Sequence, residues 1–482
     1  MIGEEKIGEL AKLHGTPLYI FDKEELYKRI GDIQKMLGED ITLCYAMKAN
    51  PFLVDALKPL VAKFEVCSPG EFAICRRENV DMSSIVLSGV YKKQSDIEYV
   101  MDECGGVGVY TVESMEQFNI LCCCAKIREI TIAVLLRLTS KNQFGLDELE
   151  IEQIIENRAD YPYIDILGIQ YYSGTQKKKV EVNIKELQQL DTFCKQLKNK
   201  YDFTVKELEY GPGLMVSYFG EDAYKNDYKM LQEFLTALEK VKKNYHITLE
   251  MGRYLVATCG IYVSKVVDIK VHSEQQYCII DGGINHINYY GQTMAMKIPA
   301  YAYVKNDGTI VKAYGLLKKD SVNIETLHIN NNKSSNDIET LNTDEKNLNI
   351  DCKISNLDDE NLSIDSKTSN TDDENLSIDC KTLNVDDKKC IIDNEKLKWT
   401  ICGSLCTVAD VIVKNLPIGQ PDKEDLLFFY NIGAYSVTEG IYLFLSRTLP
   451  KIITYDKNGI VEVLRDFYDS DIINSRKFVL NK

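Results

Sequence analysis

The chain has 482 residues, of which 45% are hydrophobic and 27% charged, a composition typical of a globular protein too long for one compact core. No apolar run approaches the roughly 18 residues of a membrane span, and the N-terminal MIGEEKIGELAKLHG lacks the basic and apolar regions of a secretory signal. The net charge of −16 argues against a nucleic-acid partner, because neutralising phosphates requires clustered Lys and Arg.

Fifteen cysteines in a chain without an export signal predict a cytoplasmic protein with reduced thiols, most of them packed as small hydrophobic side chains. Cys402 and Cys406 have no C-x-x-C or histidine pair nearby, whereas a structural zinc site needs four ligands at characteristic spacing. We therefore expect no metal site, with zinc as the less favoured alternative.

From Thr42 to about Gly252 the sequence alternates short apolar runs with amphipathic stretches such as NPFLVDALKPLVA and YKMLQEFLTALEKVKK. The predicted strands are ITLCYAMK, FEVCS, IVLSG, VGVYTV, IAVLLRL, ILGIQYY, ELEYG and ITLEMG. Eight strands alternating with helices over about 200 to 250 residues predict an α/β fold, a (β/α)₈ TIM barrel at residues 22–255. A doubly wound open sheet has the same local pattern and is the alternative.

The pattern changes after residue 253. The segments YLVATCGIYVSKVVDIKV, QYCIIDGG, AYAYV and DLLFFYNIGAYS are rich in β-branched and aromatic residues and have no helical period between them. They predict a mostly antiparallel β-domain made of residues 1–21 and 256–482, to which the early PLYIF supplies a further strand.

Residues 318–396 interrupt this β-domain with a low-complexity repeat, in which Asn342, Asn356, Asn370 and Asn384 recur at a spacing of 14. Each unit offers too few apolar side chains to stack as a solenoid. A disordered insertion is therefore favoured over a solenoid or a separate binding module.

Lys48, in CYAMKANP, ends the first barrel strand, where a residue faces the active-site mouth. Taken alone it is typical of a surface lysine, but a desolvated lysine beside a carbonyl cofactor forms a Schiff base. Strands seven and eight end in Tyr210-Gly211-Pro212-Gly213 and Glu250-Met251-Gly252-Arg253, at the loops that recurrently bind phosphate in such barrels. An amine, a phosphate cradle and a carboxylate for the pyridine nitrogen together predict a pyridoxal phosphate site.

Seven motifs resemble, in order, those of the fold type III pyridoxal-phosphate decarboxylases, which have the alanine racemase fold and include the diaminopimelate, ornithine and arginine decarboxylases. They are YAMKAN, CSPGEF, GIQYYSGTQ, GPGL, EMGRYLVA, GSLCTVADV and GAYSVTEG. Together they run from residue 45 to residue 440 and cover most of the chain outside the insertion.

The resemblance implies that Lys48 forms the Schiff base, that Glu250 faces the pyridine nitrogen and that Cys406 protonates the α-carbon after carbon dioxide leaves. In this family the cysteine enters from the neighbouring subunit, which implies a homodimer with shared active sites. The other cofactor-binding positions that it implies are Glu65, Arg137, Tyr172, Thr175, Gly211, Gly213, Gly252, Arg253 and Tyr435.

The sequence departs from the family at several of these positions. Tyr172 stands where a histidine usually stacks on the cofactor, and Glu65 replaces an aspartate. DGGINHINYYG lacks the arginine that follows this strand in diaminopimelate decarboxylases, and Thr407 stands where relatives have Glu or Asp. Because a buried ammonium without a carboxylate costs several kcal/mol, free diamino acids are less favoured substrates.

We therefore expect a pyridoxal-phosphate-dependent carboxy-lyase that acts on an amino acid or a derivative. The motifs YYSGTQ, NYYGQ, GSLCT and GAYSVTEG resemble the subgroup that decarboxylates glutamate held as a thioester on an acyl carrier protein, as in butirosin biosynthesis. An amino-acid racemase of the same fold would need a second base, typically Tyr, where this chain offers Cys406. A non-catalytic regulator tends to lose the lysine or the phosphate contacts, and this chain retains both.

Overall fold

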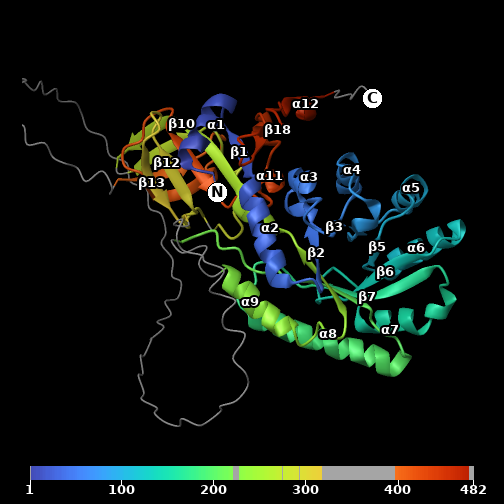
Figure 1. The fold of residues 1–482 in the computed structure, drawn as a ribbon. Helices are drawn as coiled ribbons and strands as arrows, with labels where there is room; N and C mark the ends of the chain where they lie inside the picture. Colours follow the sequence, from blue (N-terminus) through green and yellow to red (C-terminus); the bar gives the residue numbers. More distant parts are fainter. Residues whose placement is uncertain (1, 221–226, 274, 293, 317–396, 477–482) are drawn as a thin grey trace, which may run out of the picture. The chain divides into compact units, whose positions relative to one another are not determined.

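The computed structural model describes residues 2–220, 227–273, 275–292, 294–316 and 397–476 (Figure 1). The predicted insertion at residues 318–396, with its 14-residue repeats, lies outside the described residues. None of the helices within the described ranges combines the length and the apolar composition needed to cross a bilayer.

Eight parallel strands close into a barrel in chain order, and each lies within one of the predicted strands or overlaps it. They are β2 (Ile41–Ala46), β3 (Lys63–Val66), β4 (Ile85–Leu87), β5 (Val109–Val112), β6 (Ile132–Arg137), β7 (Ile164–Tyr172), β8 (Glu207–Gly211) and β9 (His246–Met251). The pairing of β9 with β2, in which Leu249 lies opposite Leu43, closes the barrel and excludes the open-sheet alternative. Strands buried on both faces have continuous apolar runs, which is why all eight were predictable.

Helices alternate with these strands and bury apolar side chains against the barrel. They are α2 (Lys23–Leu37), α3 (Val54–Leu57), α4 (Pro69–Arg77), α5 (Gln94–Cys104), α6 (Met115–Arg128), α7 (Glu148–Glu156), α8 (Val180–Tyr201) and α9 (Asp227–Leu238). Figure 1 shows α8 and α9 side by side. The helix expected in NPFLVDALKPLVA shrinks to α3 after a 3-10 turn, and Pro59, which has no backbone N–H, cannot continue the helical hydrogen bonds.

Ten further strands form a second, mostly antiparallel sheet. They are β1 (Leu18–Asp22), β10 (Gly260–His272), β11 (Gln275–Ile280), β12 (Tyr301–Val304), β13 (Ile310–Tyr314), β14 (Lys398–Cys402), β15 (Val411–Pro417), β16 (Leu426–Tyr430), β17 (Lys451–Tyr455) and β18 (Val461–Arg465). β1 pairs with β10 and β17, so PLYIF joins this sheet as predicted. The predicted fold class is confirmed, whereas the domain boundaries stay predictions.

The strand predicted from YLVATCGIYVSKVVDIKV begins later than expected. Arg253–Val256 form the short helix α10 and Ala257–Cys259 a 3-10 turn, and β10 starts at Gly260. These residues are all buried, and Nε of Arg29 on α2 donates to the carbonyl oxygen of Tyr254 at 2.7 Å. A helical turn buried on every side has a continuous apolar sequence, so periodicity does not distinguish it from a buried strand.

Three helices accompany the second sheet and were not predicted: α1 (Glu4–His14), α11 (Ser436–Glu439) and α12 (Asp471–Asn474). α1 packs Ile7 and Leu10 into a buried cluster with Leu18 and Ile20 of β1. The segment 1–21 therefore contributes a helix as well as the expected strand.

Candidate active site

Lys48 lies just beyond the end of β2, in the 3-10 turn Met47–Ala49 at the carboxyl end of the barrel. Its Nζ is 2.8 Å from Oε2 of Glu65 on β3 and 3.5 Å from Oε1 of Glu250 on β9. Desolvation lowers the pKa of Lys48, but the two carboxylates raise it and outweigh desolvation, so this pKa lies well above its usual value. The amine is a charged group held between two buried acids, not a solvated surface lysine.

Cys67 completes the contacts of Glu65 and was not among the predicted site residues. Its Sγ donates to Oε1 of Glu65 at 2.7 Å and lies 3.7 Å from Nζ of Lys48. Burial and the Glu65 carboxylate raise the pKa of the Cys67 thiol, so the thiol is protonated at neutral pH. Its place directly after β3 is the same strand-end signal that identified Lys48 after β2.

Glu250 on β9 is buried inside the barrel mouth. Its Oε2 accepts a hydrogen bond from Nε2 of Gln170 on β7 at 3.0 Å. Burial and the Glu65 carboxylate raise the pKa of Glu250, and the amine of Lys48 opposes them. Gln170 was also not predicted, although side-chain alternation along β7 puts it on the same face as Tyr172, two residues on.

One pocket brings together residues that lie far apart in the sequence. The predicted site residues that line it are Lys48, Tyr172, Thr175, Gly213, Glu250, Gly252, Arg253 and Tyr435. Glu65 reaches the same place through its ion pair with Lys48. The ends of β2, β7 and β9, the loop after β8 and the segment after β16 therefore converge on one point.

The glycines of the β8 loop allow close approaches that a side chain would block. A Cβ on Gly213 would clash with the carbonyl oxygen of Gly174, and the φ of Gly213 is +59°. Gly211 does not line the pocket, but a Cβ there would lie 2.5 Å from the ring of Tyr172, which does. Gly211 makes room for that ring, whereas Gly213 exposes backbone to the pocket.

Arg253 supplies a buried cation on the pocket wall. Its Nη1 donates to the hydroxyl of Tyr218 at 2.8 Å, and its guanidinium carbon lies 4.3 Å from the ring centroid of Tyr435. Within the described ranges the buried Nε of Arg253 has no hydrogen-bond partner, and no carboxylate forms an ion pair with the guanidinium. A buried cation is costly without an anion, so this wall suits a phosphate.

These groups fit pyridoxal phosphate. The amine of Lys48 suits its aldehyde, and the buried Glu250 has room for one more hydrogen-bond donor, such as a protonated pyridine nitrogen. The orphaned Nε of Arg253 and the bare backbone of Gly213 suit its phosphate.

Arg137 and Cys406 do not line the pocket either. Nη1 of Arg137, at the end of β6, pairs with Oε2 of Glu113 at 2.9 Å, and its guanidinium stacks over Phe144. Cys406 is exposed in the segment between β14 and β15. The roles predicted for both residues stay predictions. The described residues hold no group of three or more His, Cys, Asp or Glu side chains arranged to bind a metal.

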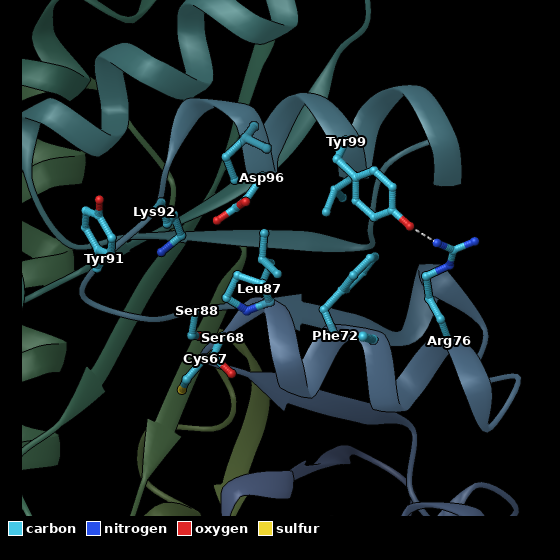
Figure 2. A pocket seen from close by; sticks show the side chains of 14 residues that line it. Cys67, Ser68, Phe72, Arg76, Leu87, Ser88, Tyr91, Lys92, Asp96 and Tyr99 are labelled. Atoms are coloured by element: carbon cyan, nitrogen blue, oxygen red, sulfur yellow. Dashed lines mark hydrogen bonds between the residues drawn. The ribbon is translucent and has the colours of Figure 1, made fainter. Parts of the chain in front are cut away.

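A second cavity lies between α4 and α5, and Figure 2 shows Cys67 at one end of it and Arg76 at the other. Its walls are mostly apolar, but Lys92 is buried there and donates to the carbonyl oxygen of Gly89 at 2.8 Å. Burial lowers the pKa of Lys92 to about 8. Cys67, which lines this cavity, also lies 3.7 Å from Nζ of Lys48, which lines the first pocket.

Comparisons with known proteins point to the same chemistry. The family model described as the pyridoxal-binding domain of the pyridoxal-dependent decarboxylases matches residues 23–257. The chain is 27% identical over 296 residues to a diaminopimelate decarboxylase of Aquifex aeolicus, covering 58% of this chain and 69% of that protein. It is 23% identical over 332 residues to an L-glutamyl-[BtrI acyl-carrier protein] decarboxylase of Niallia circulans, covering 64% and 77%.

Solved structures have the same fold. A crystal structure of diaminopimelate decarboxylase from M. jannaschii with L-lysine aligns with a TM-score of 0.69 at 21% identity, over 98% of this chain and 94% of that one. The diaminopimelate decarboxylase from Helicobacter pylori with L-lysine gives 0.68 at 18% identity, over 96% and 97%. At these identities the likeness supports the arrangement of barrel and sheet.

Proposed function

Through residues 23–257 the chain belongs to the pyridoxal-dependent decarboxylases, and from this premise we propose which residues carry the reaction and what the substrate is. The chain is a pyridoxal-phosphate-dependent decarboxylase of an amino acid or an amino-acid derivative. The observation that carries the residue assignment is the amine of Lys48, held 2.8 Å from Glu65 and 3.5 Å from Glu250 at the mouth of the barrel.

When bound, pyridoxal phosphate supplies an aldehyde for an amine and a ring that withdraws electrons from the α-carbon as carbon dioxide leaves. In our proposal Lys48 holds the cofactor covalently, and the carboxylate of Glu250 keeps the pyridine nitrogen protonated. Arg253 binds the phosphate together with the backbone around Gly213 and Gly252, which line the same pocket.

Glu65 has a separate role in the proposal. The amine of Lys48 must lose a proton before it acts as a nucleophile, and Oε2 of Glu65 accepts a hydrogen bond from it at 2.8 Å. Glu65 therefore contacts the amine directly and orients it. Tyr172 stacks on the cofactor ring, while Thr175 and Tyr435 close the phosphate end of the pocket.

We propose a substrate whose end remote from the α-carbon carries no free charge. Thr407 stands where the resembling enzymes have an acid, and its hydroxyl accepts a hydrogen bond from the N–H of Ala409 at 3.3 Å. Glutamate held on an acyl carrier protein through its side-chain carboxyl meets this requirement, and one relative is named for that activity. Free diaminopimelate is the second candidate, because several relatives are named for it.

We propose that the enzyme is a homodimer with shared active sites. Cys406 is exposed beside Val408, which is fully exposed. Nη2 of Arg447 donates to the carbonyl oxygen of Ser404 at 2.6 Å and ties this loop to the segment 441–447, in which several large apolar side chains are exposed. An apolar surface next to the predicted proton donor suits a second copy of the chain. A reducing, cytoplasmic location suits the cysteines, which are free throughout the described residues.

The residue assignment is tested with protein reconstituted with pyridoxal phosphate. Borohydride reduction followed by peptide mass spectrometry should place the label on Lys48, Lys48→Ala should remove it, and Lys93→Ala, at an exposed lysine, should keep it. A label elsewhere would refute the assignment.

The substrate is tested by measuring carbon dioxide from free diaminopimelate, ornithine, lysine and arginine beside carrier-bound glutamate. Release from the carrier-bound substrate alone supports our first candidate, and release from diaminopimelate supports the second. Optical inversion without carbon dioxide would indicate a racemase.

A further inference from the structure

Glu209 lies on β8 inside the barrel and is fully buried, and neither carboxyl oxygen has a partner among the described residues. It pairs in register with Gln170 on β7. Oε1 of Gln170 is likewise buried without a partner in the described chain, whereas its Nε2 donates to Glu250. An amide oxygen and a carboxylate are both acceptors, so these two groups can form a hydrogen bond with each other only if the carboxyl group carries a proton.

We propose that Glu209 is a protonated carboxylic acid that donates a hydrogen bond to Oε1 of Gln170 and so fixes the amide with Nε2 toward Glu250. Glu209 is then a positioning residue for the carboxylate that faces the pyridine nitrogen. This inference rests on the role of Glu250 in the proposed function.

The charges around Glu209 favour its neutral form. The titratable groups that face it are Glu250 on β9, Glu207 on β8, Lys63 and Glu65 on β3 and Cys44 on β2. Lys63, the cation of this set, already pairs with Glu207. Burial, and then the nearby Glu250, raise the pKa of Glu209 well above its usual value. An ionised Glu209 would be a second buried negative charge with no donor, whereas the acid supplies the O–H that Gln170 lacks.

The orientation of Gln170 matters because the two ends of an amide have nearly the same shape. Without a donor at Oε1 the amide can rotate and turn that oxygen toward Glu250. Glu250 would then lose a hydrogen bond that lowers its pKa. A protonated Glu250 no longer supplies the negative charge that keeps the pyridine nitrogen protonated.

Infrared difference spectroscopy of the cofactor-free protein tests whether the carboxyl group of Glu209 is protonated. At neutral pH, wild type minus Glu209→Gln should show a band of a protonated carboxylic acid. The matched control Glu207→Gln, at an ion-paired glutamate on the same strand, should leave that band in place. Absence of the band from the wild-type spectrum would overturn the proposal, and this measurement does not depend on cofactor or activity.

The second test asks whether Glu209 fixes the amide of Gln170. It uses ¹⁵N-labelled pyridoxal phosphate bound to wild type, Glu209→Gln and Glu209→Met. Gln keeps a donor for Gln170 and Met does not, so only Glu209→Met should move the ring-nitrogen shift toward the unprotonated value. Its kcat should fall about ten- to a hundredfold below that of Glu209→Gln, the factor that one hydrogen bond to a charged group provides.

If the two variants are equally impaired, or if Glu209→Met matches wild type, the positioning role is refuted. If wild type binds no cofactor, the proposed function fails, while the infrared result still decides whether Glu209 holds a proton. The melting temperatures of both variants identify a loss caused by misfolding, and in that event the infrared measurement decides the proposal.

Discussion

The backbone N–H of Tyr435 donates to the carbonyl oxygen of Ala49 at 2.6 Å. Ala49 adjoins Lys48, and Tyr435 follows β16 of the second sheet, so this bond joins barrel and sheet at the proposed cofactor pocket. Tyr435 adopts a φ of +67°, which a non-glycine residue holds only when its surroundings stabilise it. Nδ2 of Asn50 reinforces the junction by donating to the carbonyl oxygen of Gly433 at 2.8 Å. The proposed phosphate end of the pocket therefore depends on the second sheet as well as on the barrel.

Gly213→Ala is expected to weaken pyridoxal phosphate binding by about tenfold or more, because a small displacement of a binding loop has effects of that size. The added Cβ clashes with the carbonyl oxygen of Gly174, so the loop after β8 must move. Titrating the cofactor-free protein with pyridoxal phosphate and recording the absorbance measures the change in affinity. The control is Gly220→Ala, where φ is also positive but nothing lies within 4 Å of the new Cβ. Equal losses in the two variants would show that the contact with Gly174 is irrelevant.

Inorganic phosphate is expected to raise the melting temperature of the cofactor-free protein through Arg253. A ligand at about a hundred times its dissociation constant stabilises by about 2.7 kcal/mol, and Arg253→Met should abolish that gain. Arg253 is buried without an anion in the described chain, whereas Arg137 pairs with Glu113. Arg137→Met should therefore keep the phosphate response yet lower the starting stability, because it strands the Glu113 carboxylate. A phosphate response that survives in Arg253→Met would refute the phosphate site.

The strand-end residues of the site were predictable because a barrel strand ends at the active-site face whatever the rest of the chain does. That rule and the strand pattern place Lys48 and Glu250 at this face, whereas their roles rest also on the family resemblance and stay predictions. Cys67 also lies at a strand end, but its sequence position does not distinguish it from any other small residue near the start of a helix. Gln170 reaches Glu250 across the intervening strand β8, and that contact exists only once β7, β8 and β9 have paired in register. Tertiary geometry, not local pattern, decides such contacts.

The second sheet was less predictable than the barrel, for a related reason. β13 is largely exposed and β18 is partly exposed, so neither has the buried apolar run that identifies a barrel strand. β14 follows the 318–396 insertion directly, and its partners β11 and β15 lie on both sides of that insertion. When two strands pair across a segment of that length, the local sequence of neither strand predicts the pairing. PLYIF was found because all five residues of β1 are buried.

Lowering the pH below about 6.5 is expected to destabilise the protein through His286. Burial, aided by Arg465 and Arg447, lowers the pKa of His286 from 6.5 to about 3. The unfolded chain therefore binds a proton that the folded chain does not, so the stability present above pH 6.5 is lost as the pH falls toward 3. At pH 5 the loss is about 2 kcal/mol, from 1.5 pH units at about 1.36 kcal/mol each.

Urea midpoints at pH 7 and pH 5 measure this effect. The wild-type midpoint should fall further between the two pH values than that of His286→Asn, which has no group to titrate there. His246→Asn, at an exposed histidine, should behave as wild type. A drop of the same size in His286→Asn would assign the acid sensitivity to other groups.

Lys48→Ala and Cys406→Ala are expected to be inactive alone and to restore activity when mixed. Lys48 lines the pocket and Cys406 does not, so a shared site would combine Lys48 of one chain with Cys406 of the other. Random exchange of subunits makes half of the dimers mixed, and each mixed dimer has one site with both residues, so about a quarter of wild-type activity should return. Carbon dioxide release after co-expression with two affinity tags measures it, and Lys48→Ala mixed with itself is the control. Mixed dimers that form but stay inactive would show that each site takes Lys48 and Cys406 from the same chain, and the shared site would be refuted.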